Sequence, residues 1–184
     1  HTTYLDNEEH LGESFLKQME LMRTRYPEKY NHTILGGWRE KAEGVIFTDW
    51  KIGEYISQGV DVFGADFGFS LDPSTLIKVS IDKANRRIYA EELLYKPNLT
   101  TNQLREVYKR ECGRNLIVAD GAEPRLIAEL RGDVNIKPAI KGAGSINFGI
   151  ALIQNYTLIV TPNSKNLIKE LNNYAWHDKK SETP

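Results

Sequence analysis

The sequence has little cysteine and no long hydrophobic run. Cys112 is the only cysteine in the 184 residues, which excludes an internal disulfide framework and a cysteine-based zinc site. A lone thiol is typical of proteins from a reducing, intracellular setting. No segment approaches the roughly 18 consecutive apolar residues that cross a bilayer, and the sequence has no signal-peptide pattern. We therefore expect no membrane partner.

The chain also lacks an excess of charge and a nucleotide-binding loop. It has 24 basic and 25 acidic residues, for a net charge of -1. This balance is compatible with nucleic-acid binding, because a neutral protein can carry a basic face. No Gly-x-x-x-x-Gly-Lys-Ser/Thr motif occurs, so a P-loop is excluded. The chain begins with His1 rather than Met, and we expect it to be a piece of a longer protein.

The pattern of the chain changes near residue 59. Before it, residues 1–58 are predicted to form a helical and then irregular extension, with a helix over residues 9–25 because apolar residues recur there at helical spacing. After it, residues 59–184 are long enough for one compact domain with a core. The sequence thus predicts an extension followed by a single folded domain.

Residues 59–184 are predicted to form three strands followed by alternating helices and strands. Strands are expected at 60–67, 74–82 and 87–95, the last two joined by a hairpin turn, and Thr100 or Thr101 is expected to cap the helix that follows. Alternating helices and strands imply parallel pairing. The predicted fold is α/β: an antiparallel three-strand meander continued by parallel strands and flanked by helices. The later strands are expected at 116–120, 134–140 and 157–160, and the later helices at 123–131, 145–154 and 163–174.

Two aspartates stand where apolar strands end in small residues. Asp66 ends the first strand of the meander, and Asp120 ends the strand at 116–120. A carboxylate at the exit of a buried strand is costly to desolvate unless a positive group compensates it. If the two strands are neighbours, about 4.8 Å apart, both carboxylates can share one metal ion or flank a pair of ions roughly 3.5–4 Å apart.

The type of ligand atom indicates which metal is expected. Each acidic residue could also have a role other than metal binding. Oxygen ligands favour Mg²⁺ or Mn²⁺ over zinc, and such ions hydrolyse phosphodiesters. Each aspartate alone is also typical of a turn or a helix cap. Glu123, three residues after Asp120, could reach the metal or could merely favour the start of a helix. The pair predicts a metal-dependent nuclease.

Several segments resemble one protein family. Residues 60–80, around Asp66, look like the first nuclease motif of the large terminase subunit of tailed bacteriophages. Residues 119–127 resemble its second motif, which commonly reads Asp-Ser-Ala-Glu-Pro, so Gly121 is a small departure. Residues 3–7, 141–150 and 167–176 are similar to further family segments. The resemblance covers nearly the whole chain.

The resemblance implies a ribonuclease H-like fold and an endonuclease that cuts concatemeric double-stranded viral DNA during packaging. It implies two-metal catalysis with Mg²⁺ or Mn²⁺, and Asp66 and Asp120 carry over as catalytic metal ligands. The family's third acidic residue comes from an Asn-His-x-x-Asp-Ala motif that this sequence does not contain; Asp178, beside His177, is a candidate substitute, though a surface position is the favoured interpretation for both. The site is therefore expected to be incomplete.

The resemblance also implies partners and a location. The packaging ATPase domain would precede residue 1, and the small terminase subunit and the portal protein would be partners in the host cell cytoplasm. Lys137, Lys141 and Arg125 are candidates for contacts to the DNA backbone. Such contacts are sequence-independent and sensitive to salt.

Parts of the sequence are also compatible with two other functions. Asp66-Phe67-Gly68 matches the metal motif of kinases and the phosphate loop of actin-like sugar kinases, but no kinase glycine-rich loop precedes it, and the second lobe of the actin-like fold is missing. The other alternative is a non-catalytic module that docks DNA or the portal. Metal-dependent cutting of DNA distinguishes an enzyme from such a module.

Overall fold

The computed structural model describes residues 10–27, 30, 44–68 and 70–176. The chain divides into two compact units, His1–Glu43 and Gly44–Pro184. In the first unit, helix α1 spans Glu13–Arg25 and buries Met19, within the range that its apolar spacing predicts. No helix of the described residues has the length and apolar character to cross a membrane.

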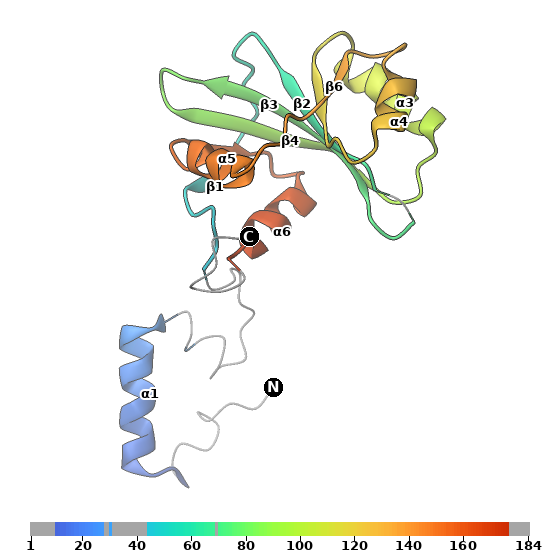
Figure 1. Cartoon of the computed structure of the whole chain (residues 1–184). Helices are drawn as coiled ribbons and strands as arrows, with labels where there is room; N and C mark the ends of the chain where they lie inside the picture. The colour runs from blue at the N-terminus through green and yellow to red at the C-terminus, as the bar shows by residue number, and fades with distance from the viewer. Residues whose placement is uncertain (1–9, 28–29, 31–43, 69, 177–184) are drawn as a thin grey trace. The chain divides into compact units, whose positions relative to one another are not determined.

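The second unit contains a seven-stranded mixed sheet (Figure 1). Its order is β1-β7-β4-β3-β2-β5-β6. The β2–β3 and β3–β4 pairs are antiparallel and every other pair is parallel. This is the predicted meander continued by parallel strands. The strands are β1 (Trp50–Ile52), β2 (Val62–Asp66), β3 (Ser74–Asp82), β4 (Arg87–Lys96), β5 (Ile117–Ala119), β6 (Ile136–Pro138) and β7 (Thr157–Val160).

Four helices of the described residues accompany the sheet; α3 begins where predicted, and the other three lie within two residues of their predicted ends. They are α3 (Thr101–Cys112), α4 (Pro124–Leu130), α5 (Ser145–Ile153) and α6 (Lys165–Asn173). Thr100 caps α3 as predicted: its side chain accepts from the backbone N–H of Gln103, and the Gln103 side chain accepts from the backbone N–H of Thr100. This reciprocal pair satisfies two backbone donors at the start of the helix.

The start of α6 is stabilised by another strand, because the side chain of its N-cap residue, Ser164, makes no capping bond. The Ser164 hydroxyl accepts instead from the backbone N–H of Glu92 at 2.8 Å. The Glu92 carboxylate accepts from the Leu167 backbone N–H at 2.6 Å and from the Asn166 side chain at 2.7 Å. A carboxylate from β4 therefore stabilises the helix N-terminus, where negative charge is favourable.

Among the residues that the structure describes before residue 59, one strand is present. Strand β1 runs parallel to β7, with Trp50 opposite Leu158, and the unit that holds the sheet begins at Gly44. The predicted extension of residues 1–58 thus includes an edge strand of the sheet. Its three residues are too few to show an alternating pattern, and its partner lies more than a hundred positions away in the sequence, so nothing local indicated it.

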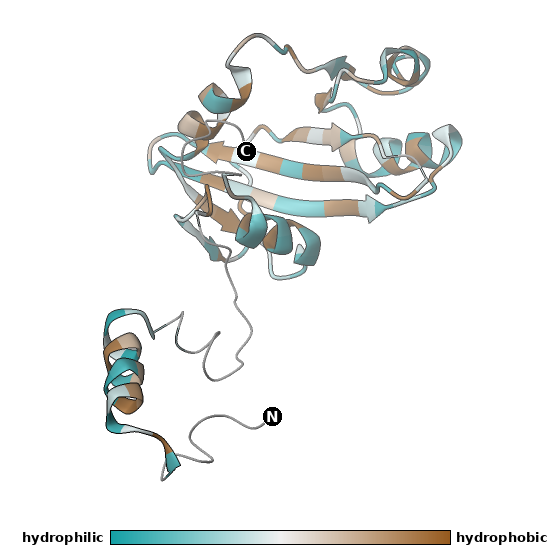
Figure 2. Ribbon diagram, turned by 60° about the horizontal axis from the view of Figure 1, so that its bottom comes forward, coloured by the Kyte–Doolittle hydropathy of each residue, from teal (hydrophilic) through white to brown (hydrophobic). Residues whose placement is uncertain are grey.

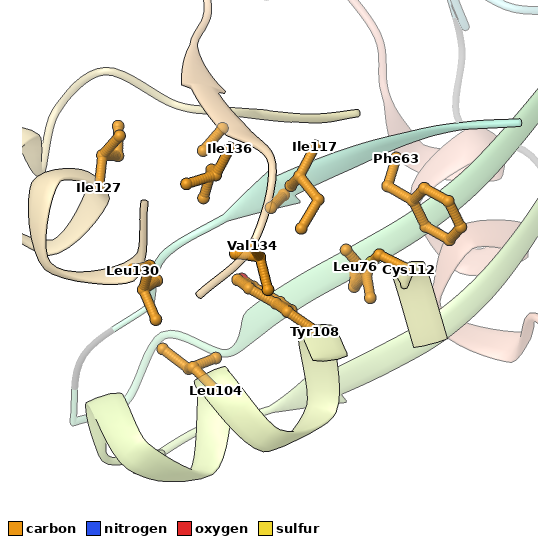
Figure 3. Close-up of a cluster of buried hydrophobic side chains, with 12 residues drawn as sticks. Phe63, Leu76, Leu104, Tyr108, Cys112, Ile117, Ile127, Leu130, Val134 and Ile136 are labelled. Carbon is orange, nitrogen blue, oxygen red and sulfur yellow. The ribbon is translucent and has the colours of Figure 1, made fainter. Parts of the chain in front are cut away.

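One face of the sheet packs against α3 and α4. Figure 3 shows side chains of β2, β3, β5 and β6 meeting those of the two helices, with Tyr108 in the middle. Phe63, Leu76 and Ile117 are at most 1% exposed. Burial of such side chains stabilises a fold by roughly 1.5–3 kcal/mol each. This cluster fixes the strands that carry the two aspartates.

A second cluster packs β4 and β7 against α6. Its buried members include Ile88, Val160 and Leu171. In Figure 2 the long strands carry both hydrophobic and hydrophilic residues, as expected where successive side chains point to opposite faces.

Candidate active site

The structure places Asp66 and Asp120 at the ends of neighbouring parallel strands, as the sequence predicts. Asp66 is the last residue of β2, and Asp120 directly follows β5. Ala65 lies opposite Ala119 in the parallel register. The Asp120 backbone N–H donates to the Ala65 carbonyl at 3.0 Å. The two aspartates therefore leave the sheet side by side at the carboxyl ends of their strands, where open α/β sheets bind ligands.

Alternation along β2 places Asp66 on the face opposite the core. Phe63 and Ala65 are buried under α3 and α4, whereas Gly64 and Asp66 are exposed. The same alternation in β5 buries Ile117 and Ala119 and turns Val118 the other way. Side chains at alternate positions share a face. Asp66 therefore projects away from the hydrophobic cluster.

The open face continues onto β6. Gly64 lies opposite Val118, and Val118 lies opposite Lys137, whose side chain is exposed. A Cβ atom added to Gly64 would meet no atom within 4 Å. This part of the sheet leaves room beside Asp66.

Asp120 is held by Lys141 from the segment between β6 and α5. The Lys141 ammonium lies 2.7 Å from Oδ1 and 2.8 Å from Oδ2 of Asp120. Oδ1 also accepts from the Ala122 backbone N–H at 2.9 Å. The hydrogen bond from Lys141, aided by that of Ala122, lowers the pKa of Asp120 below its ordinary value. The carboxylate is therefore kept in the ionised form that a metal requires.

The ion pair with Lys141 was not predicted. The sequence singled out Lys141 for the DNA backbone only, and its 21-residue separation from Asp120 gives no local signal. The structure also shows that Asp120 does not cap α4, because no side chain caps that helix. The Ala122 bond makes a local turn instead.

Of the two remaining candidate ligands, the structure describes Glu123. Glu123 is exposed at the N-cap of α4 and makes no capping bond. With Phe67 and Gly68, which follow Asp66, it lines an open groove of about 720 Å³ that also borders α3. Asp178 lies outside the described residues. Among the described residues, no group of three or more His, Cys, Asp or Glu side chains could hold a metal ion.

The structure therefore places two carboxylates at adjacent strand ends, and the described residues contain no complete metal centre. The exposed carboxylate of Asp66 and the ionised carboxylate of Asp120 suit a hard divalent cation. Glu123 lines the groove that borders α3, and neither aspartate is among the residues lining it.

The candidate DNA contacts come from three different segments. Lys137 extends from β6, Lys141 follows it by four residues, and Arg125 lies in the first turn of α4. All three side chains are exposed. Of these, only Lys141 has a contact to a predicted site residue in the described part of the chain.

Comparison with known families agrees with this geometry. The family model described as "Terminase RNAseH like domain" matches residues 66–184, which include both aspartates. The chain belongs to this family. Membership of this family thus agrees with the sheet order and with the position of the two aspartates in it.

One relative extends the comparison in both sequence and structure. The large terminase subunit of Bacillus phage SPP1 is 29% identical over 198 residues, covering 100% of this chain and 46% of the relative, so this chain spans about half of that protein's length. The crystal structure of the SPP1 large terminase nuclease domain with bound Mn superimposes with a TM-score of 0.62 at 27% identity, covering 75% of this chain and 85% of that one. The terminase nuclease likeness therefore extends to both sequence and structure.

A more distant match supports the fold alone. The nuclease domain of the P22 large terminase superimposes with a TM-score of 0.57 at 12% identity, covering 75% of this chain and 81% of that one. The ribonuclease H-like architecture predicted from the sequence is confirmed.

Proposed function

We propose that this chain is a metal-dependent endonuclease that cuts concatemeric double-stranded viral DNA during genome packaging. The observation that carries the proposal is the pairing of Asp66 and Asp120 at adjacent strand ends on an open face of the sheet. The SPP1 relative, solved with bound Mn, supports a divalent ion as cofactor. Mg²⁺ or Mn²⁺, as a pair of ions, fits the oxygen donors.

Asp66 and Asp120 would hold the ions. When bound, the ions supply an activated water and stabilise the leaving oxygen in phosphodiester hydrolysis. The chain's own residues position the reaction: the ladder between β2 and β5 fixes the spacing of the two carboxylates, and the lowered pKa of Asp120 keeps it charged. Glu123, and Asp178 beyond the described residues, are the candidates for a third ligand.

The DNA backbone would be bound by Lys137, Lys141 and Arg125. All three are exposed cations, and contacts of this kind carry no sequence information. Binding should therefore weaken as salt increases, with little preference among DNA sequences. The packaging ATPase domain, the small terminase subunit and the portal protein are the proposed partners, acting in the host cell cytoplasm.

Cleavage of supercoiled plasmid DNA tests the proposal. We expect nicked and linear products with Mn²⁺ or Mg²⁺ and none with EDTA. Asp66→Asn and Asp120→Asn should each lower the rate on the order of 10³-fold, because charge stabilisation is commonly the largest catalytic effect. Asp82→Asn is the matched control: this half-buried carboxylate ends β3 at the hairpin, where its side chain bonds Asn85.

One observation favours a second function. No group of three side chains that could hold a metal ion occurs among the described residues. A non-catalytic module that docks DNA or the portal would also lack such a group. DNA binding without cutting under any divalent ion would support that alternative. Full cleavage activity in either site variant would reject the assignment of the two aspartates.

A further inference from the structure

The contact between Lys141 and Asp120 concerns both the metal and the DNA. We propose that Lys141 is an exchangeable counter-ion: it occupies the Asp120 carboxylate in the metal-free protein, leaves when a divalent ion binds, and then pairs with a DNA phosphate. This inference rests on the proposed nuclease function and adds a positioning residue to it.

The first step of the argument is occupancy. The Lys141 ammonium contacts both oxygens of Asp120, at 2.7 and 2.8 Å, and the Ala122 backbone N–H takes a further position on Oδ1. A divalent ion held by the same oxygens would bring two cationic centres within a few Å, where like charges repel. Lys141 and the ion therefore compete for Asp120.

The second step is mobility of the lysine head. The Lys141 side chain is 59% exposed, whereas that of Asp120 is 32% exposed. Within the described part of the chain, the Asp120 carboxylate is the one hydrogen-bond partner of the Lys141 ammonium. Exposed ion pairs are worth only about 0–1 kcal/mol, and a four-carbon stem gives the ammonium wide reach. The pair can therefore open at little cost.

The third step is that the lysine remains near the site after it leaves Asp120. The Ala139 backbone N–H donates to the Ala119 carbonyl at 2.7 Å, and the Ser145 backbone N–H donates to the Gly142 carbonyl at 3.1 Å. The backbone on both sides of Lys141 is thus tied down, first to the strand that precedes Asp120 and then to the start of α5.

The last step is the change of partner. Bound ions neutralise Asp120 and remove its attraction for Lys141, while the incoming DNA brings phosphate charges to the same edge of the sheet. The released ammonium then gains a new anionic partner. Metal binding and DNA binding would be coupled through one side chain, so each should favour the other.

The test compares Lys141→Met with Lys137→Met. Both remove one exposed lysine near the site, but Lys137 has no ion pair with Asp120 in the described structure. Calorimetric titration of Mn²⁺ into the full chain without DNA should show about 2- to 5-fold tighter binding for Lys141→Met, the range expected when an exposed ion-pair competitor is removed. Lys137→Met should shift the affinity less, and Lys141→Arg should keep the wild-type value.

A second measurement follows the released lysine. With Mn²⁺ bound and Asp66→Asn added to prevent cutting, loss of Lys141 should reduce the slope of log affinity against log salt for DNA by about one. Circular dichroism would verify that each variant keeps its fold.

The outcomes separate this inference from the nuclease assignment. Unchanged or weaker Mn²⁺ binding by Lys141→Met overturns the exchange, as does an unchanged salt slope, even if the wild type cuts DNA. If the wild type does not cut DNA, and if Asp120→Asn binds Mn²⁺ as tightly as the wild type, the proposed function itself fails.

Discussion

The two faces of β2 have opposite environments: one packs into the hydrophobic cluster and the other is exposed. Phe63 and Ala65 pack under α3 and α4, while Gly64 and Asp66, which alternate with them, face outward. Five residues thus carry both a hydrophobic core and one member of the candidate metal pair. One face should determine stability and the other should determine chemistry, so substitutions one position apart should have separable effects.

The largest stability effect should come from the core face. Phe63→Ala removes a ring that is 1% exposed, and large-to-small changes of this kind cost about 3–5 kcal/mol. Gly64→Ala is the matched change on the open face. Its added Cβ meets nothing within 4 Å, and an alanine restricts the unfolded chain, so we expect a change within about 1 kcal/mol, toward greater stability.

Urea denaturation followed by circular dichroism measures both variants. The prediction is contradicted if Gly64→Ala destabilises as much as Phe63→Ala, which would mean that the outer face is packed. Plasmid cleavage by the folded Gly64→Ala protein adds a functional readout: slower cutting with unchanged stability would place DNA close to Gly64.

The carboxylates of Asp61, which precedes β2, and Asp120, which follows β5, extend the comparison. Asp61 precedes the strand and accepts from the Tyr55 and Ser57 hydroxyls, each at 2.8 Å, with the Lys78 ammonium 3.4 Å away. Its side chain is 17% exposed, about half the value for Asp120. Asp61 therefore has the environment of a structural ion pair, and Asp120 that of an exchangeable one.

Asp61→Asn should destabilise the fold by about 2 kcal/mol at pH 7, since hydrogen bonds to a charged group contribute roughly 1.5–3 kcal/mol. Asp120→Asn, on the exposed site, should change stability by less than about 1 kcal/mol. Equal losses in the two variants would remove the distinction between the two sites. Urea midpoints of the wild type and the two variants supply the measurement.

The Asp61 effect should also depend on pH. Burial alone would raise the pKa of Asp61, but the hydrogen bonds from Tyr55 and Ser57 and the charge of Lys78 lower it overall. The folded state then binds the proton less tightly than the unfolded state, whose pKa is about 3.9. The stabilisation is therefore fully present well above that value and is lost as the pH falls through the lower folded pKa.

We expect the stability difference between the wild type and Asp61→Asn to be constant from about pH 7 to pH 5 and to shrink below about pH 4. Urea titrations at pH 7, 5, 4 and 3 check this. A difference that grows on acidification would show that the folded pKa of Asp61 is raised instead.

These comparisons also show what the sequence could and could not predict. The adjacency of Asp66 and Asp120 was predictable because both end apolar runs, and the first parallel strand was expected to pair with the first strand of the meander, as the observed order shows. The cap at Thr100 was predictable because its signal lies within four residues.

The features that escaped prediction depend on contacts distant in the sequence. The pairing of β1 with β7 joins residues more than a hundred positions apart, and the Glu92 carboxylate reaches α6 over 75 positions. Lys141 was singled out for its charge, but its bond to Asp120 depends on how the segment after β6 turns back toward β5. Sequence patterns report local periodicity and chemistry; they do not report which side chains meet across the sheet.

A buried hydroxyl beneath β2 gives the smallest and most specific prediction. Tyr108 is fully buried in the cluster of Figure 3, and its hydroxyl has no hydrogen-bond partner among the described residues. Burial raises the pKa of Tyr108, so the group stays neutral. Because an unpaired buried polar group costs about 1–3 kcal/mol, Tyr108→Phe should stabilise the fold by about 1 kcal/mol.

Tyr108→Leu is the control for this variant. It also removes the hydroxyl but loses ring contacts, and should destabilise the fold by more than about 1 kcal/mol. The test is a shift of the urea midpoint to higher concentration for Tyr108→Phe with an unchanged slope, which identifies a change in stability rather than in the exposed surface. A lower midpoint for Tyr108→Phe would mean that the hydroxyl has a bonding partner, such as a buried water, and the core face of β2 would then be less completely apolar than its neighbouring side chains indicate.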